Sequence, residues 1–311
     1  VHDRREDSGP DGGDCVRTLL GALTLMTATA PGFVGEGADE RIADPGAELL
    51  SLASDAGRPG TLAYCVRRML GAAEAVRDQL SGDTWMVVGS LESELAALRT
   101  TTPGQPSIVQ DRLGHVLQNL LALQGLAADS MVRDVGWHFM DAGRRIERAL
   151  QLAALLRATV AVRHDTATDS LLFESVLVAG ESIITYRRRY RSHAQIETLL
   201  DLLVADPGNP RSLRHQIDRL SADVTVLPGG NVPGRPTPEE KHVLELSTRL
   251  RVLDTGAVAT VDSDERRPDL DAFLDDVARA LTEVADALQS RNFEQLVPQR
   301  QMTSGGTEAE A

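Results

Sequence analysis

The chain has 311 residues, of which 42% are hydrophobic and 25% charged, as in an ordinary soluble globular protein. Its 46 acidic and 32 basic residues give a net charge of −14, which argues against nucleic acid as a partner because phosphate binding depends on clustered lysine and arginine. Aromatic residues make up only 3%, so leucine, alanine and valine have to build the core.

Apolar residues recur at three- and four-residue intervals along most of the chain, a pattern that predicts an all-α multi-helix bundle. The expected helices cover residues 16–28, 47–54, 61–80, 83–98, 107–128, 135–162, 170–191, 193–204, 210–224, 238–253 and 268–289. Two of them carry start signals: Asn209 precedes Pro210, and the segment from Thr237 to Glu240 has the form of a capping box. No stretch reaches the roughly 20 apolar residues that span a bilayer, so we expect no membrane association.

Polar segments without periodicity bound this helical region. Residues 1–13 and 298–311 are predicted to be disordered, which leaves residues 14–297 as the helical domain. An apolar run after Val16 resembles the centre of a signal peptide, but acidic residues precede it where an export signal is basic. Cys15 and Cys65 lie in apolar helical contexts and form no CxxC pair, so we expect buried free thiols and a cytoplasmic location.

A weak internal repeat relates residues 49–69 to residues 199–220. In both copies a leucine-rich helix is followed by a turn of the form Asp-x-Gly-x-Pro and then by a second helix. Convergent turn chemistry explains such a match locally. Because the register holds through both helices, we expect a duplicated helical unit with a shared core, its copies covering about residues 16–130 and 135–297.

The helix that begins near Trp137 is unusual, because charged residues precede an apolar continuation of the kind that is normally buried. Its predicted core stripe consists of Phe139, Gly143, Ile146, Leu150 and Ala153. Glu147 lies on the border of this stripe, and Arg144, three residues earlier on the same side, is close enough to pair with it. Arg148 points away from the stripe.

Two interpretations of these charges stay open. Asp141 can reach Arg144 or Arg145 along the helix, so the charges can form a buried ion-pair network that fixes the register of the helix. Alternatively, Glu147 is a general base, an acid or a ligand-binding group held by Arg144 and Arg148.

The predicted helix over residues 170–191 repeats the pattern. Its expected core face consists of Leu172, Val176, Ala179, Ile183, Tyr186 and Tyr190, and its opposite face carries Glu174, Glu181, Thr185 and Arg188. Such a polar face is typical of a solvated surface. If this polar face lay against the Trp137 helix instead, the two helices would form one cleft that contains Glu147. The further candidate residues of that cleft are Asp141, Trp137, Glu181, Arg188, Tyr186 and Arg211.

The sequence predicts neither a metal nor a cofactor. A di-metal carboxylate bundle requires two Glu-x-x-His motifs, and only Glu239-x-x-His242 occurs, at a helix start where capping explains its glutamates. His193 with Glu197 is a weaker pair. There is no glycine-rich phosphate loop, and the basic run over residues 187–191 is typical of a solvated helix end.

Three segments together resemble a known family. They are the Gly136-Trp137 segment through Gly143-Arg144-Arg145-Ile146-Glu147-Arg148-Ala149, the Ile184-Thr185-Tyr186-Arg187 segment through Tyr190, and the Asp206-Pro207 segment through Leu213. The chain resembles the alpha-E family over about residues 16–296. These are bacterial all-helical proteins named for a glutamate–arginine motif, which here would be Glu147-Arg148.

The resemblance implies a context for the chain. Members of the family occur beside, or fused to, circularly permuted ATP-grasp ligase-like proteins, with transglutaminase-like and proteasome-like peptidases nearby. This implies a role in making or modifying peptides through amide bonds, in which ATP and Mg²⁺ are bound by the ligase partner alone. Members usually open with a further Trp…Gly-Arg…Glu-Arg-Ala helix, and no segment before Val16 matches it.

Three functions follow as alternatives. The first is an accessory or scaffold protein that docks an ATP-grasp-type partner, which predicts an exposed apolar or mixed patch. The second is a stand-alone enzyme of peptide modification that uses Glu147 with Arg144 and Arg148. The third is a purely structural helical bundle.

Overall fold

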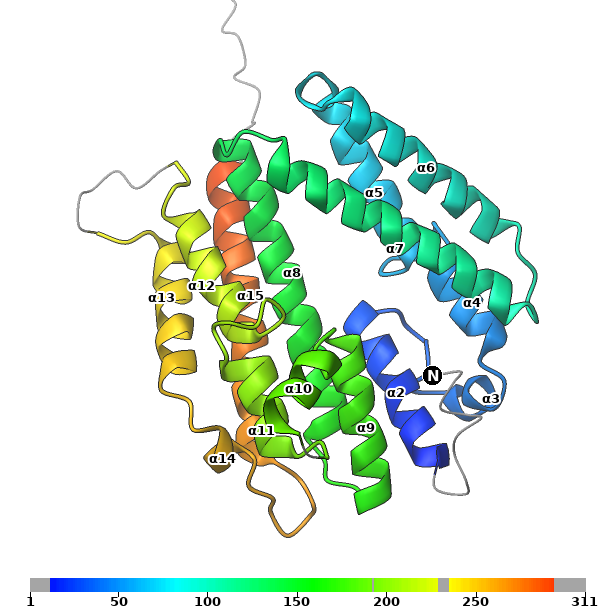
Figure 1. The fold of residues 1–311 in the computed structure, drawn as a ribbon, viewed down its shortest axis with the longest axis vertical. Helices are drawn as coiled ribbons and strands as arrows, with labels where there is room; N and C mark the ends of the chain where they lie inside the picture. The colour runs from blue at the N-terminus through cyan, green and yellow to red at the C-terminus, as the bar shows by residue number, and fades with distance from the viewer. Residues whose placement is uncertain (1–11, 192, 229–234, 294–311) are drawn as a thin grey trace, which may run out of the picture.

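The computed structural model describes residues 12–191, 193–228 and 235–293 of the chain. Within those ranges the chain is all-α, as predicted, and its one β feature is an isolated bridge between Val162 and Arg266 (Figure 1). The α-helices are α2 (Gly12–Thr27), α3 (Ala38–Ala43), α4 (Gly46–Ser54), α5 (Leu62–Ala75), α6 (Gly82–Arg99), α7 (Pro106–Asp129), α8 (Val135–Val160), α9 (Thr166–Ala179), α10 (Ile183–Tyr190), α11 (Ile196–Leu200), α12 (Leu213–Val224), α13 (Pro238–Arg251), α14 (Thr255–Val258) and α15 (Pro268–Asn292). A 3₁₀ turn covers Arg77–Gln79, and a π-helical turn covers Asp201–Ala205.

Four helices form the main bundle. Helix α8 packs against α12 and α15, and α13 packs against the same two helices from the other side (Figure 1). Apolar side chains at helical spacing explain this arrangement, because Leu156, Leu220, Leu274 and Leu281 are fully buried where the helices meet. Helix α2 also packs along α8, so α8 is buried on several sides.

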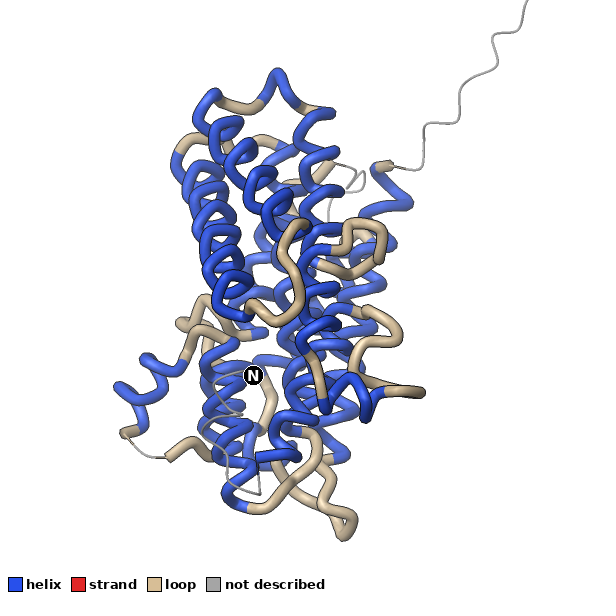
Figure 2. Tube along the Cα trace, turned by 90° about the vertical axis from the view of Figure 1, so that its right-hand side faces the viewer, coloured by secondary structure: helices blue, strands red, loops and turns tan. Residues whose placement is uncertain are grey.

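Helices α4–α7, which we call the arm, have a smaller core of their own. It consists of Ala63, Val66, Leu91, Leu95, Leu98 and Val116. Helix α7 meets the start of α8 at one end and diverges from it toward the other end (Figure 1), and Figure 2 shows the same elements from the side. Helices α6 and α7 pack closely together, whereas α5 makes its main helix contact with α4.

Several predicted boundaries are wrong for identifiable reasons. The expected helix over residues 170–191 is broken between α9 and α10, because the backbone of Glu181 turns into the left-handed region at φ 47°. Gly180 lies directly against Leu203, where a Cβ atom would come within 3.2 Å of the leucine side chain. The helix expected from Pro210 starts at Leu213 instead, because Ser212 is its N-cap. The helix expected over residues 193–204 starts only at Ile196, and residues 196–205 form α11 and the π-helical turn.

Other local predictions can be compared directly. The capping box is confirmed, since the Glu240 N–H donates to Thr237 Oγ1 and the Thr237 N–H donates to the Glu240 carboxylate. Cys15 is buried, but Cys65 is exposed, so the prediction of a buried thiol was wrong for Cys65. Of the segments predicted to be disordered, residues 12 and 13 belong to α2, while 1–11 and 298–311 lie outside the described residues.

The two repeated turns have matching hydrogen bonds. The Asp55 carboxylate accepts from the Gly57 N–H at 2.8 Å, and the Asp206 carboxylate accepts from the Gly208 N–H at 2.8 Å. In each copy the following N-cap hydroxyl donates to the carbonyl of that aspartate at 2.5 Å and accepts from the helix, as Thr61 in one turn and Ser212 in the other. The duplication of the whole unit stays a prediction.

Candidate functional site

Helix α8 carries the charged segment, and its first turn is fixed by local contacts. The Asp134 side chain caps the helix by accepting from the Trp137 N–H at 2.9 Å. Trp137 is buried and donates its indole N–H to the Ala127 carbonyl at the end of α7, at 2.9 Å. Trp137 therefore joins α7 to α8, which is a structural role for a residue that the sequence placed in a cleft.

Asp141 is the buried carboxylate of this segment. Its side chain is fully buried, and it accepts hydrogen bonds from Arg144 and from Arg145, whose Nε lies at 3.2 Å. Burial alone would raise the pKa of Asp141, but the hydrogen bond from Arg144 and the charge of Arg145 hold it below its ordinary value. A buried ion-pair network of the kind predicted therefore exists, with Asp141 at its centre.

A second carboxylate from α12 joins this network. His138 Nδ1 lies 2.9 Å from Asp223 Oδ1, and both side chains are largely buried. Burial raises the pKa of Asp223, and the nearby charge of Asp141 raises it further, against the opposite effect of His138. Arg145 also donates to Gln216 Oε1 at 3.2 Å, so α8 and α12 are joined by polar contacts as well as by apolar packing.

Arg148 faces a different set of groups. It donates to Gln124 Oε1 of α7 at 2.9 Å. Burial lowers the pKa of Arg148, and the positive charges of Arg211, Arg144 and Arg145 lower it further. Two of the predicted cleft residues, Arg211 and Glu181, form an ion pair with each other beside Arg148.

These arginines form what we call the arginine cluster: Arg144, Arg145, Arg148 and Arg211. Among the described residues, Asp141 pairs with Arg144 and Arg145, and Glu181 pairs with Arg211. The cluster therefore has more guanidinium groups than carboxylates, on a protein that is acidic as a whole. Such an arrangement suits the binding of an anionic group such as a carboxylate or a phosphate.

Glu147 lies apart from that cluster. Its side chain is exposed, and within the described residues that side chain forms no hydrogen bond or ion pair. The expected pair with Arg144 does not form, because Arg144 turns to Asp141. Partial burial raises the pKa of the Cys65 thiol, although the residue is exposed, and the negative charge of Glu147 raises it further.

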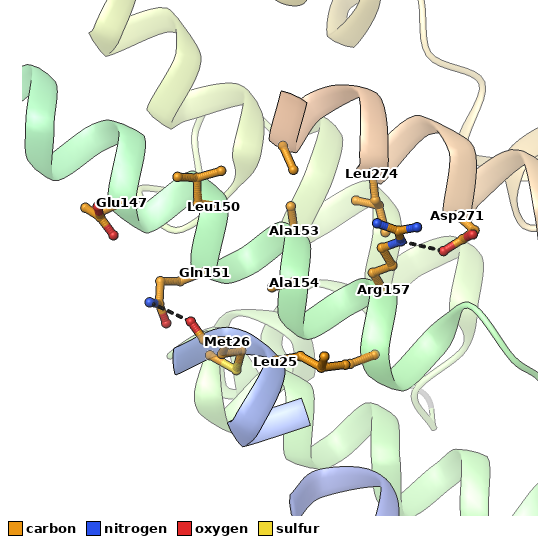
Figure 3. Close-up of a pocket in the computed structure, with 12 residues that line it drawn as sticks. Leu25, Met26, Glu147, Leu150, Gln151, Ala153, Ala154, Arg157, Asp271 and Leu274 are labelled. Atoms are coloured by element: carbon orange, nitrogen blue, oxygen red, sulfur yellow. Dashed lines mark hydrogen bonds and ion pairs between the residues drawn. The ribbon is translucent and has the colours of Figure 1, made fainter. Parts of the chain in front are cut away.

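Glu147 also borders a pocket of about 570 Å³ between α2, α8 and α15. Figure 3 shows Glu147 at one end of the pocket and the ion pair of Arg157 with Asp271 at the other. Between them the lining is mainly apolar and includes Leu25, Met26, Leu150, Ala153, Ala154, Ala158, Leu274 and Ala278. This pocket suits an apolar surface with a cation near Glu147 better than it suits a polar reaction.

The other predicted cleft residues do not join the arginine cluster. Tyr186 is buried, and its hydroxyl lies 2.5 Å from Thr198 Oγ1 and accepts from the Gln195 N–H at 3.1 Å, which fixes the loop before α11. Arg188 is exposed. In the neighbouring basic run, Arg187 pairs with Glu174 at 2.7 Å.

The sequence missed the partners that come from other helices: Gln124, Gln216 and Asp223. His138 was missed as well, although it stands next to Trp137 and three residues before Asp141. A helical wheel of α8 places His138 on the side of Asp141 and Arg145, which is the one signal that would have identified it.

In the described part of the chain, no cluster of three or more His, Cys, Asp or Glu side chains is arranged to hold a metal. The Glu-x-x-His pair is separated, because Glu239 is buried against Arg291 and His242 lies 3.2 Å from Glu283. Among the described helices, none has the length and apolar character to cross a membrane.

Comparison with known protein families identifies one that matches most of the chain. Residues 2–293 match a family model described as Alpha-E, a predicted alpha-helical domain with a conserved ER motif. The chain belongs to the Alpha-E family. Glu-Arg pairs occur in this Alpha-E chain at residues 40–41, 147–148 and 265–266, and the identification of Glu147-Arg148 as the family's motif stays a prediction.

The Alpha-E chain is also similar to longer proteins. It is 38% identical over 296 residues to the uncharacterized protein Rv2567 of Mycobacterium tuberculosis (strain ATCC 25618 / H37Rv), and equally to the uncharacterized protein Mb2597 of Mycobacterium bovis (strain ATCC BAA-935 / AF2122/97). Each match covers 92% of this chain but 33% of the relative, so the chain spans about a third of the length of these proteins. No solved structure matches the chain significantly.

Proposed function

We propose that this Alpha-E chain is a cytoplasmic accessory protein that docks an ATP-grasp-type ligase and holds an anionic part of the ligase's substrate during amide-bond formation or modification. The observation that carries this proposal is the arginine cluster, in which Arg148 lies among three other guanidinium groups. Amide formation by an ATP-dependent ligase starts from a carboxylate and passes through an acyl phosphate. Both are anions of the kind that paired guanidinium groups bind.

The cluster is accessible for such a role. The side chains of Arg144 and Arg211 keep 28% and 29% of their surface exposed, so an anion from a partner can reach them. A transglutaminase-like or proteasome-like peptidase is a further partner in this proposal, because it would act on the amide product. ATP and Mg²⁺ belong to the ligase in this proposal.

The experiment combines the chain with a circularly permuted ATP-grasp-type protein. We expect the two to co-purify and to form more ATP-dependent amide product together than the ligase forms alone. Arg148→Gln should lower product formation at least about tenfold, because one anion contact of this kind contributes about 1.5–3 kcal/mol. The matched control is Arg157→Gln, which removes an arginine paired with Asp271 away from the cluster.

The proposal would be overturned if no complex formed. It would also be overturned if the complexes of Arg148→Gln and Arg157→Gln formed the same amount of amide product. Thermal unfolding of each variant separates a folding defect from a loss of the anion contact. The midpoint of Arg148→Gln is expected within a few degrees of wild type, because the arginine's repulsive neighbours offset the loss of its bond to Gln124.

A second candidate is a stand-alone enzyme that uses Glu147 with Arg144 and Arg148, for which Glu147 is an exposed carboxylate at the end of a pocket. Glu147→Gln tests it without a partner. An enzyme would lose product formation while keeping its fold, whereas a structural or accessory role predicts unchanged chemistry by the ligase complex. The purely structural alternative predicts that every loss of activity follows a loss of folded protein.

A further inference from the structure

The pocket between α2, α8 and α15 has the size and lining of a small-molecule site. Its volume of about 570 Å³ lies within the usual range of ligand pockets, about 300–1,000 Å³. Ala154 and Ala158 are one turn apart on α8, and Ala278 lines the same pocket from α15. These short side chains leave space beside α8, and the lining extends from Glu147 to Ala158, about 16 Å along the helix axis. The pocket therefore suits an elongated apolar group.

One end of the pocket carries two hydrogen-bond acceptors that face no donor among the described residues. The first is the Glu147 carboxylate, which is exposed and forms no hydrogen bond or ion pair with the described part of the chain. The second is Gln151 Oε1, one turn further along α8, because Gln151 Nε2 donates to the Met26 carbonyl of α2 at 3.1 Å and leaves the amide oxygen free. Figure 3 shows both side chains on the same side of α8. A carboxylate and an amide oxygen can therefore accept from one ligand.

The surroundings of these acceptors favour a cation. Met26 belongs to the last turn of α2, where the carbonyl end of the helix dipole is partly negative and no basic residue of that turn offsets it. The arginines next to Glu147 in sequence turn elsewhere, since Arg144 pairs with Asp141 and Arg148 donates to Gln124 of α7. The negative charge at this end of the pocket is therefore available to a ligand.

The opposite end of the pocket offers no such charge. Arg157 donates to Asp271 at 2.7 Å and also pairs with Asp275, so two carboxylates already neutralise its guanidinium group. Leu274, which is fully buried, lines the pocket on the next turn of α15 after Asp271. A ligand that fits both ends therefore has one cationic end and one apolar end.

We propose that this pocket binds an aliphatic primary ammonium ion, whose head group lies at Glu147 and Gln151 and whose unbranched tail lies along Ala154 toward Leu274. A primary ammonium has three N–H donors, which the carboxylate, the amide oxygen and solvent accept. The tail would also cover Leu25, which lines the pocket and is 56% exposed. A free amine with a long tail fits better than a lysine side chain, whose short stem fills only the first part of a pocket about 16 Å long.

The probe for this proposal is octylamine, titrated into the full chain at pH 7 below its micelle concentration and followed by isothermal titration calorimetry. We expect saturable binding with a Kd below about 1 mM. Octanoate has the same tail with the opposite charge and should bind at least about tenfold more weakly, because Glu147 repels it. Butylamine, which imitates a lysine side chain, should also bind at least about tenfold more weakly, because its short tail buries less apolar surface.

Two variants separate the head group from the tail. Glu147→Gln should weaken octylamine binding about fivefold and leave the binding of uncharged octanol unchanged, because it removes only the charge. Ala154→Leu places a larger side chain in the path of the tail and should weaken the binding of octylamine and octanol alike, at least about tenfold. The matched control is Glu245→Gln, which changes an exposed glutamate of α13 outside the pocket lining and should leave both affinities unchanged.

Methionine methyl NMR locates the bound amine. The signal of Met26, which lines the pocket, should shift on addition of octylamine, whereas the signal of Met86, which is 70% exposed on α6, should not. The proposal would be wrong if octanoate or butylamine bound as tightly as octylamine, if Glu147→Gln kept the wild-type affinity, or if the Met26 signal stayed in place. The midpoint of thermal unfolding shows that each variant is folded. The assay contains no ligase, so its outcome is independent of the proposed accessory function.

Discussion

Asp141 is the residue on which the charged segment of α8 depends, because it is fully buried and faces two guanidinium groups. Asp141→Asn keeps the shape of the side chain but leaves those arginines without their counterion. We expect the free energy of unfolding at pH 7 to fall by about 3–5 kcal/mol, measured by urea denaturation, as when one partner of a buried pair is removed. The control Asp271→Asn breaks a partly exposed pair with Arg157 and should cost less than about 1 kcal/mol.

Asp141 also makes the stability of the folded chain depend on pH, and the direction of this dependence follows from its lowered pKa. Ionised Asp141 stabilises the folded chain above its ordinary pKa of 3.8, and this contribution is lost as the pH falls through the lower folded value. The neighbouring Asp223 has a raised pKa, so its contribution has the opposite sign and is lost as the pH rises. Stability measured from pH 7 down to about pH 2 should therefore fall less steeply in Asp141→Asn than in wild type. If the free energy of unfolding fell equally steeply toward acid pH in both proteins, Asp141 would not be the group responsible.

At the scale of elements, the N-cap of α12 shows how one side chain starts a helix and closes the turn before it. Ser212 accepts from the His215 N–H at 3.0 Å and donates to the Asp206 carbonyl at 2.5 Å, and it is fully buried. Ser212→Ala leaves both groups unpaired, so we expect the free energy of unfolding to fall by about 1–2 kcal/mol in urea denaturation. Ser212→Thr keeps the hydroxyl that Thr61 uses in the matching turn and should recover most of the loss. A threonine variant as unstable as the alanine variant would contradict this account.

At the scale of the whole molecule, the arm and the main bundle differ in how fully their helices are covered. Met69 and Ala72 in the second half of α5 are exposed, whereas Leu220 and Asp223, at the matching positions of the internal repeat in α12, are buried. Amide hydrogen exchange should therefore be faster in residues 67–76 than in residues 218–224, by at least about tenfold, because local opening of α5 breaks fewer apolar contacts. Mass spectrometry of the exchanged chain measures both segments in one sample. Equal protection would mean that the arm is as stable as the bundle.

Local periodicity determined the all-α class, most of the helix positions, the capping box at Thr237 and the reach of Asp141 to Arg144 and Arg145. These depend on contacts three or four residues apart, which spacing alone encodes. The tertiary structure decided what the spacing does not contain: Asp223 beside His138, Arg211 paired with Glu181, and Glu147 exposed instead of paired with Arg144. It also decided the break after α9, where Leu203 packs against Gly180. The reason is physical, because a helix presents its side chains by local geometry, whereas which face meets a partner depends on the packing of helices that are distant in the chain.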